Sequence, residues 1–431
     1  MAARQHVSIA LLGAGLTGLS AALECQKQGL DYQLFERESE PGGLARTTTE
    51  AGYRFDRTGH LLHVRDPALE AEVLDWLGPG TRSIQRESRI WSNGVYTHYP
   101  FQSNTYGLPP QVAYECVLDF VKAQRNPRHP APRNFEEYCR THFGDAISEH
   151  FMIPYNCRLW GVSPSEITAD WCQRFVPLPS LEDVLAGAVG LAPRKLGYNR
   201  EFLYPSEGIG RLAQVLQRQL TELYLGTSPT RIDLSGRRLL FGDRSVHYER
   251  LISSIPLSAL LGLCGPLPGD VERAARRLRC THLYYLDLAL GRPFKKDWHW
   301  IYVPEAKYPF YRVGCYSNFS ERMAPRGCAN LYVELAERSV PSLDAVLPKV
   351  IEGLVEMQLL DSAADIQFAR LRHLEHAYVI FDHDHKSTTA KLHEFLREHH
   401  VISTGRYGEW TYSSMEDALL SGRHAVQTAF E

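Results

Sequence analysis

The sequence predicts an α/β fold in which a Rossmann-type dinucleotide-binding domain is discontinuous and carries insertions. Three observations support this prediction. A strand, a glycine turn, a helix and a second strand follow one another near the N-terminus, and an acidic residue ends the second strand. Residues 401–430 show a strand–turn–helix pattern that can return to the same domain, so the segments between are insertions.

The first unit is defined by its hydrophobic pattern. Residues 7–13 are rich in Val, Ile and Leu and predict a short buried strand. Leu16–Lys27 predict a helix that ends at Gly29, and residues 32–36 predict the next strand. These elements together form a β-α-β unit of the usual length, about 30 residues.

The rest of the chain mixes helices and strands without strict alternation. Residues 109–161 are predicted to be mostly helical, 231–255 to form strands around a turn at 242–243, 282–290 and 328–336 to be strands, and 347–360 to be an amphipathic helix. We therefore expect a dinucleotide-binding domain at 1–90, 200–270 and 390–431, a mainly helical substrate domain at 91–199, and a substrate domain with a mixed, antiparallel sheet at 271–389.

Composition excludes several classes of protein. The chain has 431 residues, 44% hydrophobic and 23% charged, with a formal net charge of -3, so nucleic acid is not an expected partner. None of its nine cysteines forms a CxxC pair, which argues against disulfides and structural zinc and favours a reducing, cytoplasmic location. No signal peptide and no apolar run of about 18 residues is apparent, so no membrane association is expected.

The glycine turn has the sequence GAGLTG at residues 13–18. The first glycine permits a tight turn, the second lets the backbone approach a pyrophosphate, and the third lets the helix pack on the strand. A carboxylate at the end of the second strand can accept hydrogen bonds from ribose hydroxyl groups. The alternative is a turn kept for packing alone. The expected dinucleotide contacts are Gly13, Gly15, Leu16, Thr17, Gly18 and Glu36.

A second glycine loop, PGGLAR at residues 41–46, follows the acidic residue, and the C-terminal segment contains GR at 405–406 and MEDA at 415–418. These segments resemble the FAD proteins of the amine oxidase and protoporphyrinogen oxidase class. The resemblance implies that the two glycines approach FAD closely, that the arginine balances the pyrophosphate charge, and that a C-terminal helix meets the isoalloxazine edge. The implied FAD contacts are Gly42, Gly43, Leu44, Arg46, Gly405, Arg406 and Met415.

Several separated segments carry a narrower resemblance. They are TGH at residues 58–60, RES at 86–88, YPFQ at 99–102, NCRLW at 156–160, Arg174, Asn199, FYR at 310–312 and YGEWTY at 407–412. In this order they resemble UDP-galactopyranose mutases of the eukaryotic type, over most of the chain. The resemblance implies an isomerase in which N5 of reduced FAD attacks the anomeric carbon of a UDP-sugar, and a six-membered sugar ring becomes a five-membered one.

The resemblance also implies roles for single residues. Gly59, His60, Arg86 and Ser88 would lie near the flavin. The aromatic faces in YPFQ would stack on uracil, while its glutamine would read an amide edge. Two arginines suit a diphosphate because each guanidinium group can bind its oxygens in a bidentate way. The implied catalytic residues are His60, Arg174, Arg312 and Tyr412. The implied substrate-binding residues are Tyr99, Phe101, Gln102, Asn156, Trp160, Arg174, Asn199, Tyr311, Arg312, His385 and Tyr412.

Each of these residues also has a structural interpretation. The aromatic side chains can be ordinary core residues, and an arginine in an aromatic strand can shield apolar surface. The chain also departs from the mutase pattern at three places, the first of which is one residue missing before Arg174. Thr58 replaces the first glycine of Gly-Gly-His, and FDHDHK at residues 381–386 stands for Phe-Asp-His-Gly-Tyr-Pro, which puts His385 at the position of a phosphate-binding tyrosine.

A strand at this last segment would place His383 and His385 on one face. With Asp382 and Asp384 nearby, this arrangement could hold a metal ion, but a polar strand end or a phosphate-facing pair of histidines explains it as well, and no metal is expected.

The leading hypothesis is a FAD-dependent nucleotide-sugar mutase that acts on UDP-galactose or another UDP-sugar, with NAD(P)H as a candidate reductant. The alternative is a FAD-dependent oxidoreductase of the amine oxidase and protoporphyrinogen oxidase type. A catalytically silent nucleotide-sugar binder is a third class. The sequence indicates neither the sugar nor the oligomeric state.

Overall fold

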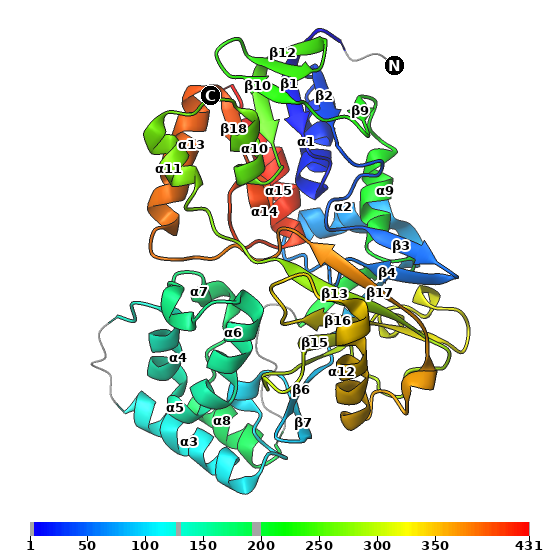
Figure 1. Ribbon diagram of the computed structural model, residues 1–431, viewed down its shortest axis with the longest axis vertical. Coiled ribbons are helices and arrows are strands. Elements are labelled where there is room, and N and C mark those ends of the chain that lie inside the picture. The colour runs from blue at the N-terminus through cyan, green and yellow to red at the C-terminus, as the bar shows by residue number, and fades with distance from the viewer. Residues whose placement is uncertain (1–3, 126–130, 192–199, 431) are drawn as a thin grey trace.

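A seven-stranded sheet forms the upper part of the molecule (Figure 1). The structure is a computed structural model that describes residues 4–125, 131–191 and 200–430, without the side chains of residues 173 and 174. The parallel strands run in the order β9, β2, β1, β12 and β18, and two antiparallel strands, β10 and β11, extend the sheet beyond β12. Their bounds are β1 His6–Leu12, β2 Tyr32–Phe35, β9 Leu223–Tyr224, β10 Arg231–Asp233, β11 Arg238–Phe241, β12 Arg244–Ser253 and β18 Val401–Ser403.

The predicted β-α-β unit is confirmed, and its helix α1 spans Leu16–Lys27. The C-terminal helix α15, Met415–Gln427, packs against α1, and a Cβ on Gly422 would lie 2.2 Å from the carbonyl oxygen of Thr17. The close approach of the two helices requires glycine there. The last helix of the described chain thus packs against the helix of the β-α-β unit. Helices on the other face of the sheet are α10 Leu257–Leu263, α11 Gly269–Ala275 and α13 His385–Glu398.

A second seven-stranded sheet lies below the first (Figure 1). Its order is β17, β13, β16, β15, β14, β6, β7, and every pair is antiparallel except β14 and β6. The strands are β6 Ser88–Ser92, β7 Val95–His98, β13 Leu283–Leu290, β14 Trp300–Tyr302, β15 Phe310–Cys315, β16 Ala329–Leu335 and β17 Ile366–Leu374. Helix α12, Leu343–Glu356, covers one face of it. Strands β6 and β7 therefore join a sheet whose other members follow residue 282.

Helices between the two strand-rich parts of the sequence gather beside the second sheet, at the lower left of Figure 1. They are α3 Pro110–Gln124, α4 Phe135–Phe143, α5 Asp145–Ile147, α6 Ile153–Trp160, α7 Cys172–Phe175 and α8 Leu181–Ala188. A π-helical turn at Ser148–Met152 leads directly into α6. Such turns often occur at functional sites.

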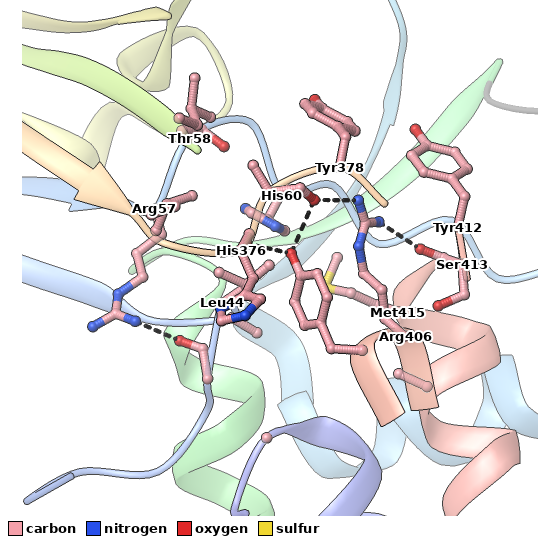
Figure 2. A pocket seen from close by; sticks show the side chains of 18 of the residues that line it. Leu44, Arg57, Thr58, His60, His376, Tyr378, Arg406, Tyr412, Ser413 and Met415 are labelled. Carbon is pink, nitrogen blue, oxygen red and sulfur yellow. Dashed lines mark hydrogen bonds between the residues drawn. The ribbon is translucent and has the colours of Figure 1, made fainter. Parts of the chain in front are cut away.

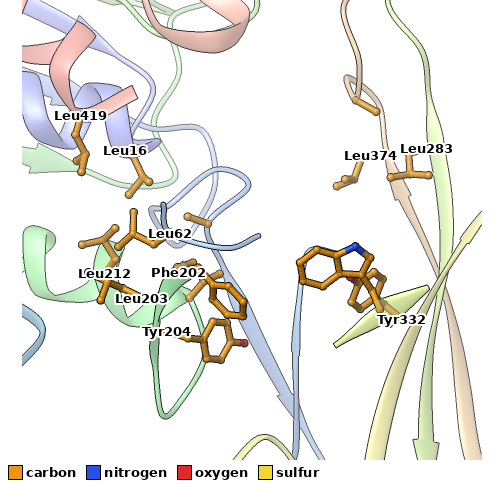
Figure 3. Packing of buried hydrophobic residues seen from close by; sticks show 14 of the residues in the cluster. Leu16, Leu62, Phe202, Leu203, Tyr204, Leu212, Leu283, Tyr332, Leu374 and Leu419 are labelled. Carbon is orange, nitrogen blue, oxygen red and sulfur yellow. The ribbon is translucent and has the colours of Figure 1, made fainter. Parts of the chain in front are cut away.

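One hydrophobic cluster joins the parts of the molecule (Figure 3). Leu16 of α1, Leu419 of α15 and Leu212 of helix α9, Gly210–Gln217, lie on one side of it, and Tyr332 and Leu374 of the second sheet lie on the other. The remaining helix of this region is α2, Pro67–Leu77, and the small two-stranded sheets pair β3 Thr47–Glu50 with β4 Tyr53–Asp56 and β5 Thr81–Gln85 with β8 Glu201–Pro205. The shared core fixes the two halves of the cavity described below.

The expectation that His383 and His385 lie on one face of a strand is wrong. Helix α13 begins at His385, and the hydroxyl group of Thr389 donates to the His385 carbonyl within its first turn. The alternation of His and Asp is typical of a strand, but these residues form a turn and the beginning of helix α13. Within the ranges described, no helix combines the length and the apolar character that a membrane crossing requires.

Candidate cofactor and substrate site

A single cavity of about 1080 Å³ runs from the glycine turn to the helices beside the second sheet. This exceeds the roughly 300–1,000 Å³ of ordinary small-ligand pockets, so it is large enough for more than one ligand. Of the residues predicted from the sequence, those that line it are Gly13, Gly15, Leu16, Thr17, Glu36, Gly42, Gly43, Leu44, Arg46, Gly59, His60, Tyr99, Gln102, Asn156, Trp160, Arg312, Arg406, Tyr412 and Met415.

The glycine turn has the geometry of a phosphate-binding loop. Gly13 has φ +91, and a Cβ there would lie 2.8 Å from the Ser254 hydroxyl oxygen. A Cβ on Gly15 would meet no protein atom within 4 Å, because this residue faces the cavity. Gly15 is also the N-cap of α1 and gives it no side-chain cap, so the first N–H groups of the helix can bind an anion.

Gly18 has the packing role expected of the third glycine. A Cβ there would lie 1.8 Å from the carbonyl oxygen of Gly13, so only glycine fits. Gly18 lies behind the cavity wall and is not among the residues that line it.

The carboxylate of Glu36 holds the turn closed. Its Oε2 accepts from the Ala14 N–H at 2.7 Å and its Oε1 from the Glu38 N–H at 2.9 Å. The second glycine loop closes on the same turn, because the Gly42 N–H donates to the Ala14 carbonyl at 2.7 Å. This hydrogen bond joins the two glycine loops to each other.

Two arginines lie beside these loops. Arg46 pairs with Glu40 at 2.8 Å, and its Nε is buried without a partner among the described residues. Arg57 donates from Nη1 to the Gly43 carbonyl at 3.1 Å, and burial together with the charge of Arg46 lowers its pKa. An anionic ligand would relieve this repulsion. Arg57 was missed as a site residue, although it directly precedes the TGH segment.

The turn, the paired glycine loops, the free helix start and the two cations fit the diphosphate of FAD. Gly13, Gly15, Gly42, Gly43 and Arg46 would hold it.

His60 lies where the two halves of the cavity meet, since the charges of Arg406, Arg312 and Arg57 all act on its ring. Leu44, His376 and Met415 line the same cavity (Figure 2). The His60 backbone N–H donates to the Thr58 carbonyl at 3.0 Å, and its ring Nδ1 is buried without a partner among the described residues. Burial, and next the charge of Arg406, lower its pKa to about 4. The imidazole is therefore neutral at ordinary pH.

Arg406 organises the loop that carries Tyr412. Its Nη1 donates to the Ser413 carbonyl at 2.9 Å and its Nη2 to the Ala377 carbonyl at 3.1 Å, and its guanidinium carbon lies 4.7 Å from the centre of the Tyr412 ring. Figure 2 shows Tyr412 projecting above this network. Its neighbour Gly405 has φ +77 and does not line the cavity.

Arg312 reaches the cavity because of a β-bulge. The register of β15 against β16 shifts between Phe310 and Arg312. As a result Tyr311 belongs to the core on the cavity side although Phe310 and Val313 face α12, and Arg312 lines the cavity. Bulges redirect side chains in this way near functional sites.

Arg312 is held by two partners. Its Nη2 donates to Glu334 Oε1 at 2.6 Å and contacts the Tyr378 hydroxyl oxygen at 3.0 Å. Glu334 has no exposed surface. Burial lowers the pKa of Arg312, but Glu334 and next the neighbouring tyrosine Tyr378 act in the opposite direction, and the net effect raises this pKa. No hydrogen bond from Arg312 Nη1 occurs within the described residues, which leaves this group available to a ligand in the cavity.

Tyr378 corrects the assignment of His385. His385 does not line the cavity, and its Nε2 lies 2.7 Å from the Trp410 carbonyl oxygen. Tyr378 does line the cavity and contacts Arg312. The signal was present in the sequence, since LEHAYV at residues 374–379 has the acid, histidine, small residue and tyrosine of Phe-Asp-His-Gly-Tyr-Pro at the same spacing.

Aromatic and amide side chains form the far end of the cavity. The Trp160 Nε1–H donates to Asn156 Oδ1 at 3.2 Å, and Asn156 Nδ2 donates to the Met152 carbonyl at 2.7 Å. Gln102 Nε2 donates to the Pro177 carbonyl at 2.9 Å, which leaves its Oε1 as an acceptor. Tyr99 stacks on Tyr302 with ring centres 4.8 Å apart.

Some predicted residues lie behind the wall or outside the described part. Phe101 is fully buried and stacks on Phe151, 5.1 Å between ring centres, so it supports the wall. Arg86 lies over the ring of Tyr99 at 4.6 Å. Asn199 and the side chain of Arg174 lie outside the described residues. No cluster able to hold a metal ion occurs among the residues that the structure describes. The predicted residues that do not line the cavity are Gly18, Arg86, Ser88, Phe101, Tyr311, His385 and Gly405.

Comparison with known proteins agrees with this arrangement. A family profile described as an NAD(P)-binding Rossmann-like domain matches residues 12–75. Protoporphyrinogen oxidase 2, chloroplastic/mitochondrial, of Arabidopsis thaliana is 24% identical over 159 residues, which is 34% of this chain and 31% of the relative. A protein of Klebsiella pneumoniae named as a probable UDP-galactopyranose mutase is 24% identical over 203 residues, 45% of this chain and 51% of the relative.

The match to a solved structure is more extensive. The crystal structure of a reduced UDP-galactopyranose mutase superposes with a TM-score of 0.91 at 27% identity, over 98% of this chain and 93% of that one. Fold and relatives together indicate a flavoenzyme similar to UDP-galactopyranose mutases and protoporphyrinogen oxidases. The chain is UDP-galactopyranose mutase-like over nearly its whole length. The chain matches about half or less of the curated relatives' lengths.

Proposed function

We propose that the protein is a FAD-dependent nucleotide-sugar mutase that interconverts the pyranose and furanose forms of UDP-galactose or a related UDP-sugar. The observation that carries the proposal is the division of one cavity. The glycine loops occupy one half, Arg312, Tyr378 and Tyr412 the other, and His60 lies where the halves meet. The superposition on a UDP-galactopyranose mutase supports it.

Bound FAD in its reduced form would supply the nucleophile for the anomeric carbon, and the protein would hold both reaction partners. Arg312 and Tyr378 would bind the diphosphate through the free Nη1 group and the tyrosine hydroxyl, with Tyr412 beside them. Charge-assisted hydrogen bonds of this kind stabilise a departing diphosphate. His60 is neutral, so the positive charge near the reacting centre would come from the arginines.

The far end of the cavity suits a uracil base. The Gln102 amide is oriented by Pro177, so its oxygen would accept from the imide N–H of uracil. Tyr99, supported by Tyr302, offers an aromatic face nearby. The side chain of Arg174 would add a second cation to the diphosphate site, as the resemblance implies. We further propose a cytoplasmic location and NAD(P)H as the reductant.

The redox balance of the reaction tests this function against an oxidoreductase. A mutase uses reduced flavin without net oxidation, so one reduction should support many turnovers of UDP-galactose under anaerobic conditions. An oxidase consumes one equivalent of oxygen for each substrate oxidised. Substrate-dependent oxygen uptake by the oxidised protein, without product from the reduced protein, would contradict the proposal and favour the oxidoreductase.

A further inference from the structure

The loop at residues 56–60 contains a threonine in an unfavourable backbone conformation. Thr58 has φ +64, the left-handed region, which a β-branched residue rarely adopts. The mutases that the chain resembles have glycine there. A residue held in such a conformation suggests a function when the surrounding structure fixes it.

The loop is fixed on both sides of Thr58. The Thr58 N–H donates to the Asp56 carbonyl at 2.9 Å, and the Thr58 carbonyl accepts from the His60 N–H at 3.0 Å. Asp56 is held by the Tyr204 hydroxyl at 2.5 Å and by the Thr47 hydroxyl at 2.6 Å. The conformation of residue 58 is therefore imposed by its neighbours.

The hydroxyl group of Thr58 is the second observation. Thr58 is only 4% exposed, and its side chain makes no hydrogen bond within the described residues. Thr58 lines the cavity, and its hydroxyl oxygen is not one of the fully buried polar atoms that lack a hydrogen-bond partner. The Thr58 hydroxyl therefore has no protein partner and opens onto the cavity, where a bound ligand can pair with it in place of water.

The position of Thr58 identifies that ligand. Its neighbour Arg57 donates to the carbonyl of Gly43 in the second glycine loop. This hydrogen bond ties the loop that carries Thr58 to the dinucleotide half of the cavity, which Leu44 and Met415 also line (Figure 2). We propose that the Thr58 hydroxyl donates a hydrogen bond to the polar edge of the flavin ring and so tunes its affinity and its reduction potential.

The direction of the effect follows from charge. Reduction adds electron density to the ring, and a hydroxyl donor at its edge binds the reduced form more strongly. Loss of the hydroxyl should therefore weaken FAD binding and lower the midpoint potential. The inference rests on FAD binding and not on ring contraction, so a protein without mutase activity would leave it standing.

Two pairs of proteins separate the effect of the Thr58 hydroxyl from the effect of the left-handed backbone conformation. Wild type and Thr58→Val differ in the hydroxyl but share a β-branched shape, and Thr58→Ser and Thr58→Ala differ in the hydroxyl without that branch. FAD retained by the purified holoenzyme is measured by equilibrium dialysis, the midpoint potential by spectroscopic titration, and UDP binding by tryptophan fluorescence. In each pair, loss of the hydroxyl should weaken FAD binding about three- to tenfold and lower the potential.

If neither pair shows a difference in FAD affinity or potential, the proposal is wrong. It is equally wrong if FAD is unaffected and only UDP-sugar binding falls, because the hydroxyl then serves the other ligand. If Thr58→Val unfolds, the serine and alanine pair decides, since these two variants impose the same backbone demand.

Discussion

At the scale of single residues, Arg312 and Glu334 link ligand binding to folding. Glu334 is fully buried, and one of its carboxylate oxygens has no partner among the described residues. Arg312 supplies the compensating charge while it also faces the cavity. Removing Arg312 should therefore lower both the affinity for UDP and the free energy of unfolding, and a matched variant can separate these two effects.

Arg312→Ala should weaken UDP binding by about 1.5–3 kcal/mol, the contribution of a hydrogen bond to a charged group. It should also lower the free energy of unfolding by about 3–5 kcal/mol, because a buried carboxylate loses its cation. The double variant Arg312→Met with Glu334→Gln should recover most of the stability without recovering UDP affinity. Denaturant unfolding and tryptophan fluorescence measure the two quantities, and a double variant that binds UDP like wild type would exclude Arg312 as a ligand.

Tyr378 and His385 give a direct test of the corrected assignment. Tyr378→Phe should weaken UDP binding by about 1.5–3 kcal/mol, because it removes a hydroxyl that lies beside Arg312 and would donate to the charged diphosphate. His385→Ala should leave UDP affinity unchanged, since His385 contacts the Trp410 carbonyl outside the cavity. Isothermal titration with UDP compares the two, and the reverse order of effects would restore His385 to the site.

At the scale of elements, two glycines of the turn have different roles. Gly15 faces the ligand, and Gly18 allows the helix to pack on the strand. Gly15 has φ -68 and ψ 177, which alanine can adopt, and its Cβ would meet no protein atom. Gly18 leaves no room for a Cβ against the Gly13 carbonyl. Two substitutions of the same size should therefore affect different properties of the protein.

Gly15→Ala should preserve the thermal unfolding of the apoprotein and weaken FAD binding about tenfold, if a methyl group at the pyrophosphate causes overpacking of about 1–3 kcal/mol. Gly18→Ala should destabilise the fold by a similar free energy, because α1 must move away from β1. Differential scanning fluorimetry of both variants with and without FAD measures this. A loss of apoprotein stability in Gly15→Ala with FAD affinity retained would contradict the assigned roles.

The elements differ in how far the sequence predicts them. The β-α-β unit follows from local periodicity and glycine positions, so α1 was predicted to the residue. The bulge that turns Tyr311 and Arg312 to one side depends on pairing with β16, which is distant in sequence. The strand expected at His383 and His385 had a local pattern of alternating residues. The motif at 374–379 was missed because the segment at 381–386 resembles the same pattern more closely in its first three residues. Local sequence patterns were enough to predict the cofactor half of the cavity. The other half depends on pairing between strands that are distant in sequence, which local patterns do not reveal.

At the scale of the whole molecule, a buried carboxyl group couples stability to pH. Asp56 is 2% exposed, and burial raises its pKa from the usual 3.8 to about 7. Its folded pKa lies above its unfolded value, so its contribution to stability is present below about pH 4 and is lost as pH rises through 7.

Asp56→Asn removes this titration while an amide oxygen can still accept from Thr47. The difference in unfolding free energy between wild type and Asp56→Asn should shift in favour of the variant as pH rises from 4 to 8, by up to about 4 kcal/mol. Urea unfolding at both pH values measures the shift. A difference that does not change with pH would mean that Asp56 is ionised throughout.

The central claim is that the cavity holds a UDP-sugar against a reduced flavin so that the sugar ring can change size. Anaerobic incubation of the dithionite-reduced protein with UDP-galactopyranose, followed by separation of the products and NMR of the sugar, tests it most directly. The expected result is UDP-galactofuranose, formed without consumption of further reductant and absent when the flavin is oxidised. Recovery of unchanged UDP-galactopyranose, and of every other UDP-hexose and UDP-pentose offered, from a protein that retains FAD would contradict it.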